Sequence, residues 1–191
     1  MTTRVKKPHN SLQVRLDDLL EYEPITKNQE VTYDAWEEDY NLVLTGSAGT
    51  GKTFMGMYLG LEQVLDPDSA QDRLVIIRSM VPTRDMGFLP GTKEEKEDAF
   101  TSPYKNIAAE LFGDNNSWNR ALSTKKIQFE STSFIRGLTL DYSVILVDEM
   151  QNLSFHELDS VITRVGKGSR IIFAGDYLQS DFTRSDDKNG I

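Results

Sequence analysis

Short apolar runs along the chain alternate with longer stretches in which apolar residues recur at helical spacing. The runs are bounded by glycine, charged or polar residues, a pattern typical of buried strands in a parallel sheet. We expect four such strands, and a further strand at a sheet edge at Lys125–Phe129. The four buried runs are Asn41–Thr45, Leu74–Ile77, Val144–Val147 and Arg170–Ala174.

The stretches between these runs predict helices and loops. Lys52–Leu65 has helical spacing and no proline, and its Gly56 and Gly60, which are poor helix formers, are expected to allow close packing on the sheet. Ser154 and Glu157 have capping-box spacing and open a helix that we expect to run to about Val165. We also expect a helix at Lys93–Phe112, interrupted near Ser102-Pro103, and loops at Ser79–Thr92 and Gly113–Ser123.

Strands that alternate with helices predict the α/β class, with a mainly parallel sheet and helices on both faces. The chain has 191 residues. This length suits one domain with a sizeable core, because domains cluster at roughly 100–150 residues. We expect residues 1–23 to form a polar N-terminal extension and residues 24–191 to form a single domain.

The first predicted strand leads directly into a glycine-rich segment, Gly46-Ser47-Ala48-Gly49-Thr50-Gly51-Lys52-Thr53. The segment matches G-x-x-x-x-G-K-[ST] at every fixed position. Glycine lets backbone N–H groups turn toward a phosphate, and the positive N-terminal end of the next helix adds to the attraction. Lys52 is expected to reach the β- and γ-phosphates, and Thr53 to coordinate Mg²⁺. The alternative is a glycine-rich strand-to-helix turn that binds nothing.

Two acids follow the most apolar of the predicted strands. Asp148 and Glu149 are expected at the carboxyl edge of the sheet, where open α/β sheets bind ligands. We expect Asp148 to hold the shell of a magnesium ion and Glu149 to accept a proton from the attacking water as a general base. The alternative is an acidic start to a loop or helix. Glu149 favours hydrolysis over nucleotide storage.

The last predicted strand ends at Gly175-Asp176-Tyr177-Leu178-Gln179. A polar residue at this edge can contact the γ-phosphate and report whether it is present. Gln179 is the candidate, because its amide can hydrogen-bond a phosphate oxygen or a water. A simple turn after the strand is the alternative.

Composition and charge narrow the classes of function. The absence of cysteine excludes disulfides and thiolate metal sites, and the presence of only two histidines excludes a histidine-rich metal site. The net charge of −9 opposes non-specific binding of nucleic acid, so such a role needs a local basic patch, an oligomer surface or a partner. Without a run of ~18–20 apolar residues or a secretory signal, a cytoplasmic protein with no membrane contact is expected.

Together these motifs resemble the PhoH-like family, a set of P-loop ATPases related to superfamily-one helicases. Further matching segments are Gly87-Phe88-Leu89-Pro90-Gly91, Phe134-Ile135-Arg136-Gly137 and Asp148-Glu149-Met150-Gln151-Asn152. The resemblance covers about Pro24 to Ile191 and looks closest to the compact versions that bacteriophages carry. It implies a RecA-like P-loop fold, ATP and Mg²⁺ as ligands, and work on RNA or single-stranded DNA.

The resemblance also implies roles for two glutamines. Gln29 lies in Ile25-Thr26-Lys27-Asn28-Gln29, which is similar to the helicase segment whose glutamine reads adenine. An amide can pair with N6 and N7 of adenine, which would favour ATP over GTP. A solvated glutamine at a helix start is the alternative. Gln151 is expected to link the hydrolytic site to the loop after the last strand.

A ring and an arginine finger are further implications of the resemblance. The ring, with a hexamer as the candidate, would be a homo-oligomer in which a neighbour completes each site. Arg78, Arg136 and Arg164 are candidates for the finger or for nucleic-acid contacts, and a surface or salt-bridged arginine is the alternative for each. Family chains usually continue past the position of Ile191 with further arginines, so a C-terminal truncation with slow hydrolysis is one interpretation.

Two other functions are compatible with a phosphate loop. A P-loop kinase for a small molecule is one, although Glu149 and the Gly87–Gly91 segment argue against it. A nucleotide-dependent assembly module, in which ATP orders an interface with little turnover, is the other. Arg120, Lys125 and Lys126 are weak candidates for nucleic-acid contact because they are few and dispersed.

Overall fold

The computed structural model of the chain describes residues 13–79 and 93–176. A five-stranded sheet forms its centre, in the order β1-β5-β4-β2-β3, and all neighbouring strands are parallel. Each predicted strand is confirmed within two residues at either end, and the predicted edge strand, β3, lies at an edge. The strands are β1 (Leu42–Thr45), β2 (Arg73–Arg78), β3 (Ile127–Ser131), β4 (Ser143–Asp148) and β5 (Arg170–Gly175).

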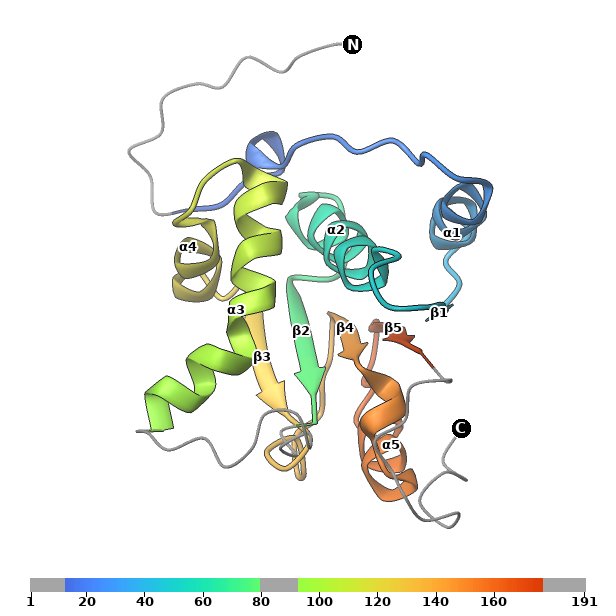
Figure 1. Ribbon diagram of the computed structural model, residues 1–191, viewed down its shortest axis with the longest axis vertical. Helices are drawn as coiled ribbons and strands as arrows, with labels where there is room; N and C mark the ends of the chain where they lie inside the picture. The colour runs from blue at the N-terminus through green and yellow to red at the C-terminus, as the bar shows by residue number, and fades with distance from the viewer. Residues whose placement is uncertain (1–12, 80–92, 177–191) are drawn as a thin grey trace.

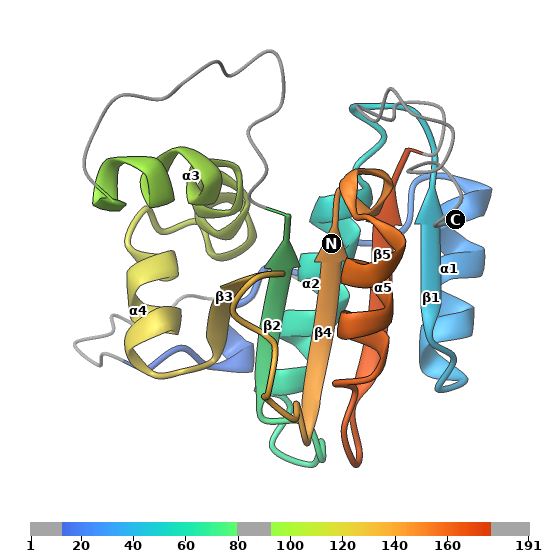
Figure 2. The same cartoon turned by 90° about the horizontal axis from the view of Figure 1, so that it is seen from below.

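Helices cover both faces of the sheet, as predicted (Figure 1). One face carries α1 (Lys27–Glu37), α2 (Lys52–Leu65), α3 (Lys93–Phe112) and α4 (Ser117–Ser123). The other carries α5 (Phe155–Ile162), which lies in front of the sheet and runs roughly along its strands in Figure 2. Two short 3-10 helices complete the described elements, η1 (Leu16–Asp18) and η2 (Met150–Asn152). No helix in the described ranges is both long and apolar enough to cross a bilayer.

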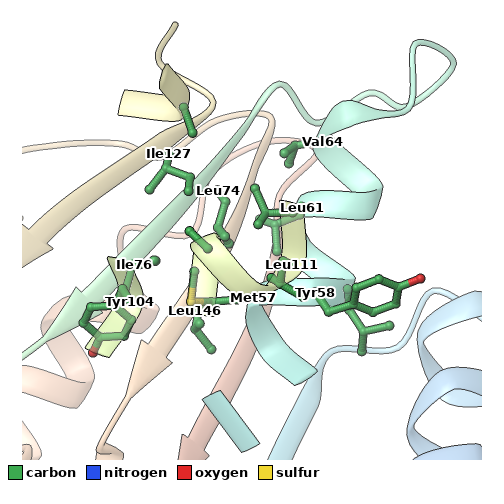
Figure 3. Packing of buried hydrophobic residues seen from close by; sticks show 14 of the residues in the cluster. Met57, Tyr58, Leu61, Val64, Leu74, Ile76, Tyr104, Leu111, Ile127 and Leu146 are labelled. Carbon is green, nitrogen blue, oxygen red and sulfur yellow. The ribbon is translucent and has the colours of Figure 1, made fainter. Parts of the chain in front are cut away.

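Successive residues of the central strands contribute to two separate apolar cores, because side chains alternate between the faces of a strand. Leu74 and Ile76 of β2 belong to the core under α1–α4, whereas Val75 and Ile77 belong to the core under α5. Strand β4 divides in the same way, with Leu146 on the first face and Val147 on the second. Figure 3 shows α2 packing its buried side chains over the first face. The sheet is therefore buried on both sides, which explains its continuous apolar runs.

The two glycines of α2 bring the helix close to the sheet. A Cβ added at Gly56 would lie 2.6 Å from Leu146 Cδ1, and one added at Gly60 would lie 2.7 Å from Leu74 Cδ1. Both distances are too short for a real contact. The predicted close packing at these glycines is confirmed, and it holds the phosphate-loop helix tightly against β2 and β4.

Two predictions for the region between β2 and β3 are wrong in part. The predicted loop at Gly113–Ser123 contains α4, because Trp118 is buried and gives this short helix its stability through tertiary contacts. Helix α3 is not interrupted at Pro103; it continues through the proline and bends (Figure 1).

Helix α5 has its predicted capping box at Ser154 but ends at Ile162, earlier than expected. The predicted loop at Ser79–Thr92 falls almost wholly outside the described residues.

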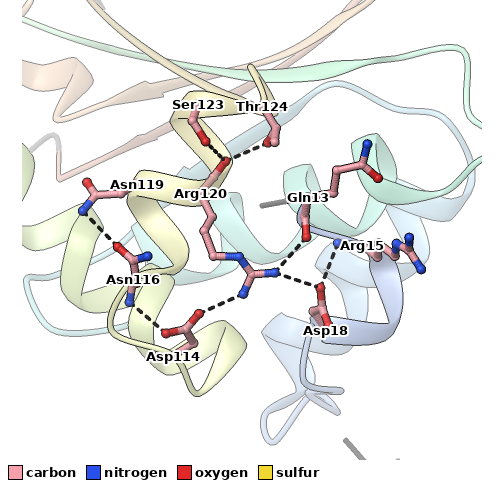
Figure 4. Close-up of polar contacts among 9 residues, drawn as sticks. All are labelled: Gln13, Arg15, Asp18, Asp114, Asn116, Asn119, Arg120, Ser123 and Thr124. Carbon is pink, nitrogen blue, oxygen red and sulfur yellow. Dashed lines mark hydrogen bonds and ion pairs between the residues drawn. The ribbon is translucent and has the colours of Figure 1, made fainter. Parts of the chain in front are cut away.

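The described part of the predicted N-terminal extension packs against the domain. Val14 and Leu19 are buried in the larger core. Arg120 of α4 donates to Gln13 O at 2.8 Å and forms ion pairs with Asp18 and Asp114 (Figure 4). This arginine, suggested above as a nucleic-acid contact, therefore ties residues 13–18 to the domain.

Candidate active site

The glycine-rich segment forms the turn between β1 and α2. Gly49 and Gly51 have φ values of 77° and 82°, in the left-handed region that favours glycine. Gly51 is the N-cap of α2, so the first N–H groups of that helix are available to an anion. Thr50 Oγ1 donates to Ser47 O at 2.9 Å and closes the turn. The segment is thus shaped for phosphate by its backbone.

Lys52 is held by the same turn. Its Nζ donates to Gly46 O and to Ser47 O, each at 2.7 Å. An ammonium makes three hydrogen bonds, and these two keep it at the mouth of the loop. To reach a β- or γ-phosphate, the ammonium must exchange these carbonyl oxygens for phosphate oxygens.

Asp148 faces the phosphate loop from the end of β4. Its carboxylate is buried, and Oδ1 accepts a hydrogen bond from Thr53 Oγ1 at 2.8 Å. A hydroxyl and a carboxylate are oxygen donors of the type that Mg²⁺ prefers, and Mg²⁺ commonly takes one or two carboxylates plus substrate phosphates. Because the Thr53 hydroxyl donates its hydrogen bond to Asp148, the lone pairs of Thr53 Oγ1 stay available to a metal. These two residues fit a magnesium ion that is bound together with a polyphosphate.

A second hydrogen bond fixes the other oxygen of Asp148. Tyr104, which is 0% exposed in α3, donates from its hydroxyl to Oδ2 at 2.7 Å. Burial and the adjacent carboxylate raise the pKa of Tyr104 well above its usual value, so the phenol stays protonated. Arg78, at the end of β2, lies near the same phenol; burial lowers the pKa of Arg78, but Tyr104 and the two acids more than offset this and raise the pKa overall.

Glu149 has a different kind of support. Its backbone lies in the left-handed region with φ 52°, which is uncommon for a residue with a side chain. Gln151 donates from Nε2 to Glu149 Oε2 and accepts at Oε1 from Asp176 N at 3.0 Å. The predicted link from the hydrolytic pair to the end of β5 is therefore confirmed as a contact through Gln151.

The three segments line one pocket of about 320 Å³, at the small end of the range for ligand sites. The phosphate loop and α2 form one side, and the ends of β4 and β5 form the other, together with Ile107 of α3. The lining residues are Ala48, Gly49, Gly51, Lys52, Thr53, Phe54, Ile107, Asp148, Glu149, Gln151, Gly175 and Asp176. The two predicted motifs, whose residues Thr53 and Asp148 are 95 positions apart in the sequence, therefore meet in one place.

Comparison with known proteins identifies the family. The model of the family described as PhoH-like protein matches residues 21–191, a range that contains all of these site residues. The chain belongs to the PhoH-like protein family. The resemblance seen in the motifs is thereby confirmed.

Curated PhoH relatives cover a similar part of this chain. Protein PhoH2 of Bacillus subtilis (strain 168) is 38% identical over 159 residues, which cover 80% of this chain and 35% of the relative. The PhoH-like protein of Synechocystis sp. is 36% identical, over 71% of this chain and 41% of the relative. The PhoH-like protein of Mycobacterium leprae is 31% identical, over 83% of this chain and 45% of the relative. This chain thus spans less than half the length of these bacterial relatives, and the phage affinity suggested above remains a prediction.

One solved structure is similar over 87% of this chain and 37% of the matched chain. It describes DNA unwinding at forked double-stranded DNA by two coordinating Pif1 helicases. The TM-score is 0.42 and the sequence identity 15%.

Several residues predicted for the site of this PhoH-like chain are placed elsewhere. Gln29 is not in the pocket lining; its Oε1 accepts from Ile25 N and Thr26 N and caps α1, so pairing with adenine would compete with this cap. Arg136 is exposed in the turn that follows β3. Arg164 follows α5 at the amino edge of the sheet, where its carbonyl accepts from Leu140 N, so it does not reach the phosphate loop of its own chain.

Only Arg78 of the three predicted arginines lies beside the hydrolytic acids. Gln179 and the Gly87–Gly91 segment fall outside the described residues. Of the basic residues considered for nucleic acid, Lys126 donates to Val64 O at 2.7 Å and caps α2. Tyr104 was missed by the sequence analysis, because a tyrosine beside a proline carries no signal of a contact with residue 148.

Proposed function

We propose that this chain binds ATP together with Mg²⁺ and hydrolyses it. The observation that carries the proposal is the 2.8 Å hydrogen bond from Thr53 to Asp148, which joins the start of the phosphate-loop helix to the end of β4, with Glu149 next to it. An anion-binding turn, oxygen donors for a metal and a carboxylate able to take a proton then share one pocket. Family membership agrees with nucleotide binding by this type of domain.

Each residue has a defined task in this proposal. The backbone N–H groups of Gly49–Thr53 and the Lys52 ammonium hold the phosphates, and Thr53 and Asp148 hold Mg²⁺, which neutralises charge on the phosphate oxygens. Glu149 accepts the proton of the attacking water, and Gln151 keeps its carboxylate turned toward the end of β5. Because general-base catalysis typically contributes 10²–10⁴-fold, Glu149 is the residue that separates turnover from storage.

Lys52→Ala tests the site directly. We expect about 100-fold weaker binding of Mg·ATPγS by calorimetry, because removing one partner of a desolvated charge pair costs about 2–5 kcal/mol. The melting temperature should be unchanged, since Lys52 is bonded only within the loop among the described residues. Lys167→Ala is the control, because it removes the same charge from the opposite edge of the sheet. Equal affinity in Lys52→Ala and Lys167→Ala would remove the phosphate loop from the proposal.

We further propose that turnover is coupled to RNA or single-stranded DNA and that the chain works as a homo-oligomeric ring. The support is the family resemblance. The net charge of −9 opposes binding of nucleic acid by the chain as a whole, so the contact requires a local basic patch or an assembled surface. Phosphate release is expected to rise when RNA or single-stranded DNA is added, and the mass in solution to be a multiple of 21.7 kDa. A flat rate with every nucleic acid, from a chain that stays monomeric with ATP, would contradict this coupling.

A further inference from the structure

A buried hydrogen bond lies behind the metal-binding side of the pocket. The hydroxyl of Tyr104 donates to Asp148 Oδ2 at 2.7 Å, and the guanidinium of Arg78 of β2 lies near the same phenol. The direction of this bond is fixed by chemistry, because a carboxylate only accepts. The Tyr104 proton therefore points at Asp148.

Packing leaves the Tyr104 ring little freedom to move. The ring is stacked on Trp118 of α4, with the centroids 6.2 Å apart and the planes at 18°, and it contacts Phe129 of β3 at 5.5 Å. Both the ring and its partner Trp118 are buried. A donor held in this way is preorganised, so its bond to Asp148 needs little ordering.

The two oxygens of Asp148 are thus fixed from two different helices. Thr53 of α2 holds Oδ1, and Tyr104 of α3 holds Oδ2. Each carboxylate oxygen accepts about two hydrogen bonds, so both oxygens can still accept from water bound to a metal. The plane of the carboxylate is set by the phenol, whereas Thr53 by itself would leave it free to turn about Oδ1.

We propose that Tyr104 is a positioning residue for magnesium: its hydroxyl holds the Asp148 carboxylate in the orientation that the metal shell requires. This rests on the proposed function. Residues behind metal ligands fix the orientation of the ligand, and their loss typically lowers metal affinity 10–100-fold. Helix α3 also gives Ile107 to the pocket lining, so its position affects both the metal side and the wall of the site.

The test compares the affinity for ATPγS in Mg²⁺ and in EDTA by calorimetry; the ratio of the two dissociation constants is the magnesium enhancement. Tyr104→Phe keeps the ring and removes the hydroxyl, and we expect the enhancement to fall about tenfold. Affinity in EDTA should stay within about twofold, since the phosphate loop is untouched. A general loss of structure would lower both affinities, so the ratio separates positioning from folding.

Tyr58→Phe is the matched control. Tyr58 is also buried in the larger core and also donates to a carboxylate, Glu62, at 3.1 Å, but it lies away from Asp148. Its magnesium enhancement should equal that of the wild type. The same enhancement in Tyr104→Phe would overturn the inference and leave ATP binding standing, whereas a wild-type chain that binds no ATPγS would overturn both.

A crystal structure of the wild-type chain with Mg·ATPγS decides the question whatever the stability of the variant. We expect the Tyr104 hydroxyl to remain within hydrogen-bond distance of Asp148 Oδ2. A phenol bonded elsewhere, with Asp148 still at the metal, would overturn the inference.

Discussion

Asp148 and Glu149 are adjacent in the sequence, yet opposite sides of the sheet support them. Asp148 is fixed from α2 and α3, on the face that carries four helices. Glu149 is held by Gln151, whose neighbours Met150 and Leu153 belong to the core under α5. The proposed metal ligand therefore has a deep, multiply bonded support, and the proposed base has a single amide.

The two sides of the sheet differ in the size of their apolar core as well as in the acid that they support. The face under α1–α4 is closed by Trp118 and Tyr104, which are buried. The buried core under α5 is smaller, and Phe155 and Ile162 of α5 itself are 61% and 55% exposed. A carboxylate that orients a metal shell gains from rigidity, whereas one that must take a proton and release it gains from a lighter restraint.

The largest effect that separates the two acids is expected from Gln151→Leu, which removes both hydrogen bonds of the amide. A hydrogen bond to a charged group contributes about 1.5–3 kcal/mol, so kcat for phosphate release should fall about 10- to 100-fold. The magnesium enhancement of ATPγS binding should be unchanged, because Asp148 keeps both of its partners. Gln128→Leu on the edge strand β3 is the control. If Gln151→Leu lowers the enhancement as well, the two acids share one support and the comparison fails.

The sequence predicted the elements of this comparison better than their contacts. Strands β4 and β5 and the phosphate loop carry strong local signals, namely apolar runs and fixed glycines, because burial on two faces leaves no polar positions. The Gln151 link followed from a family motif. The Tyr104 bond could not be predicted, because it depends on where a bent helix meets the end of a strand, and Asp148 lies 44 residues after Tyr104 in the sequence. Helix α4 was missed for the same reason: its stability comes from the burial of Trp118 rather than from a long periodic pattern.

A smaller effect, on the free energy of unfolding, compares a buried position under α1–α4 with an exposed position on α5. Gly60→Ala places a Cβ 2.7 Å from Leu74 Cδ1 and 3.3 Å from Val144 Cγ1, both in the buried core. Overpacking costs about 1–3 kcal/mol, and the better helix propensity of alanine returns up to about 1 kcal/mol. We expect a net loss of about 1 kcal/mol in the free energy of unfolding, measured with urea. Ile162→Ala, at an exposed site on α5, should change it by less than about 0.5 kcal/mol; a larger loss there than in Gly60→Ala would reverse the comparison.

The smallest effect concerns Glu157, which joins α5 to the carboxyl edge of the sheet. Its carboxylate accepts from Thr132 Oγ1 at 2.5 Å, from Ser79 Oγ at 3.2 Å and from Ser154 N at 2.9 Å. Burial raises the pKa of Glu157, but these hydrogen bonds outweigh it and hold the pKa below the usual 4.5. The folded chain therefore binds the proton less readily than the unfolded chain, and the carboxylate stabilises the fold above about pH 4.5.

Glu157→Gln should consequently destabilise the chain at pH 7, by about 1 kcal/mol or less because the group is partly exposed. The difference from wild type should shrink as the pH falls below 4.5 and through the lower pKa of the folded state, since the wild-type carboxylate then becomes neutral. Urea unfolding across this range measures it, with Glu37→Gln at the exposed end of α1 as the control. A difference that stays constant with pH would show that the amide destabilises the chain through its shape and not through its lack of charge. The side of the sheet under α5 would then depend on packing at Glu157, as the side under α1–α4 depends on packing at Gly60.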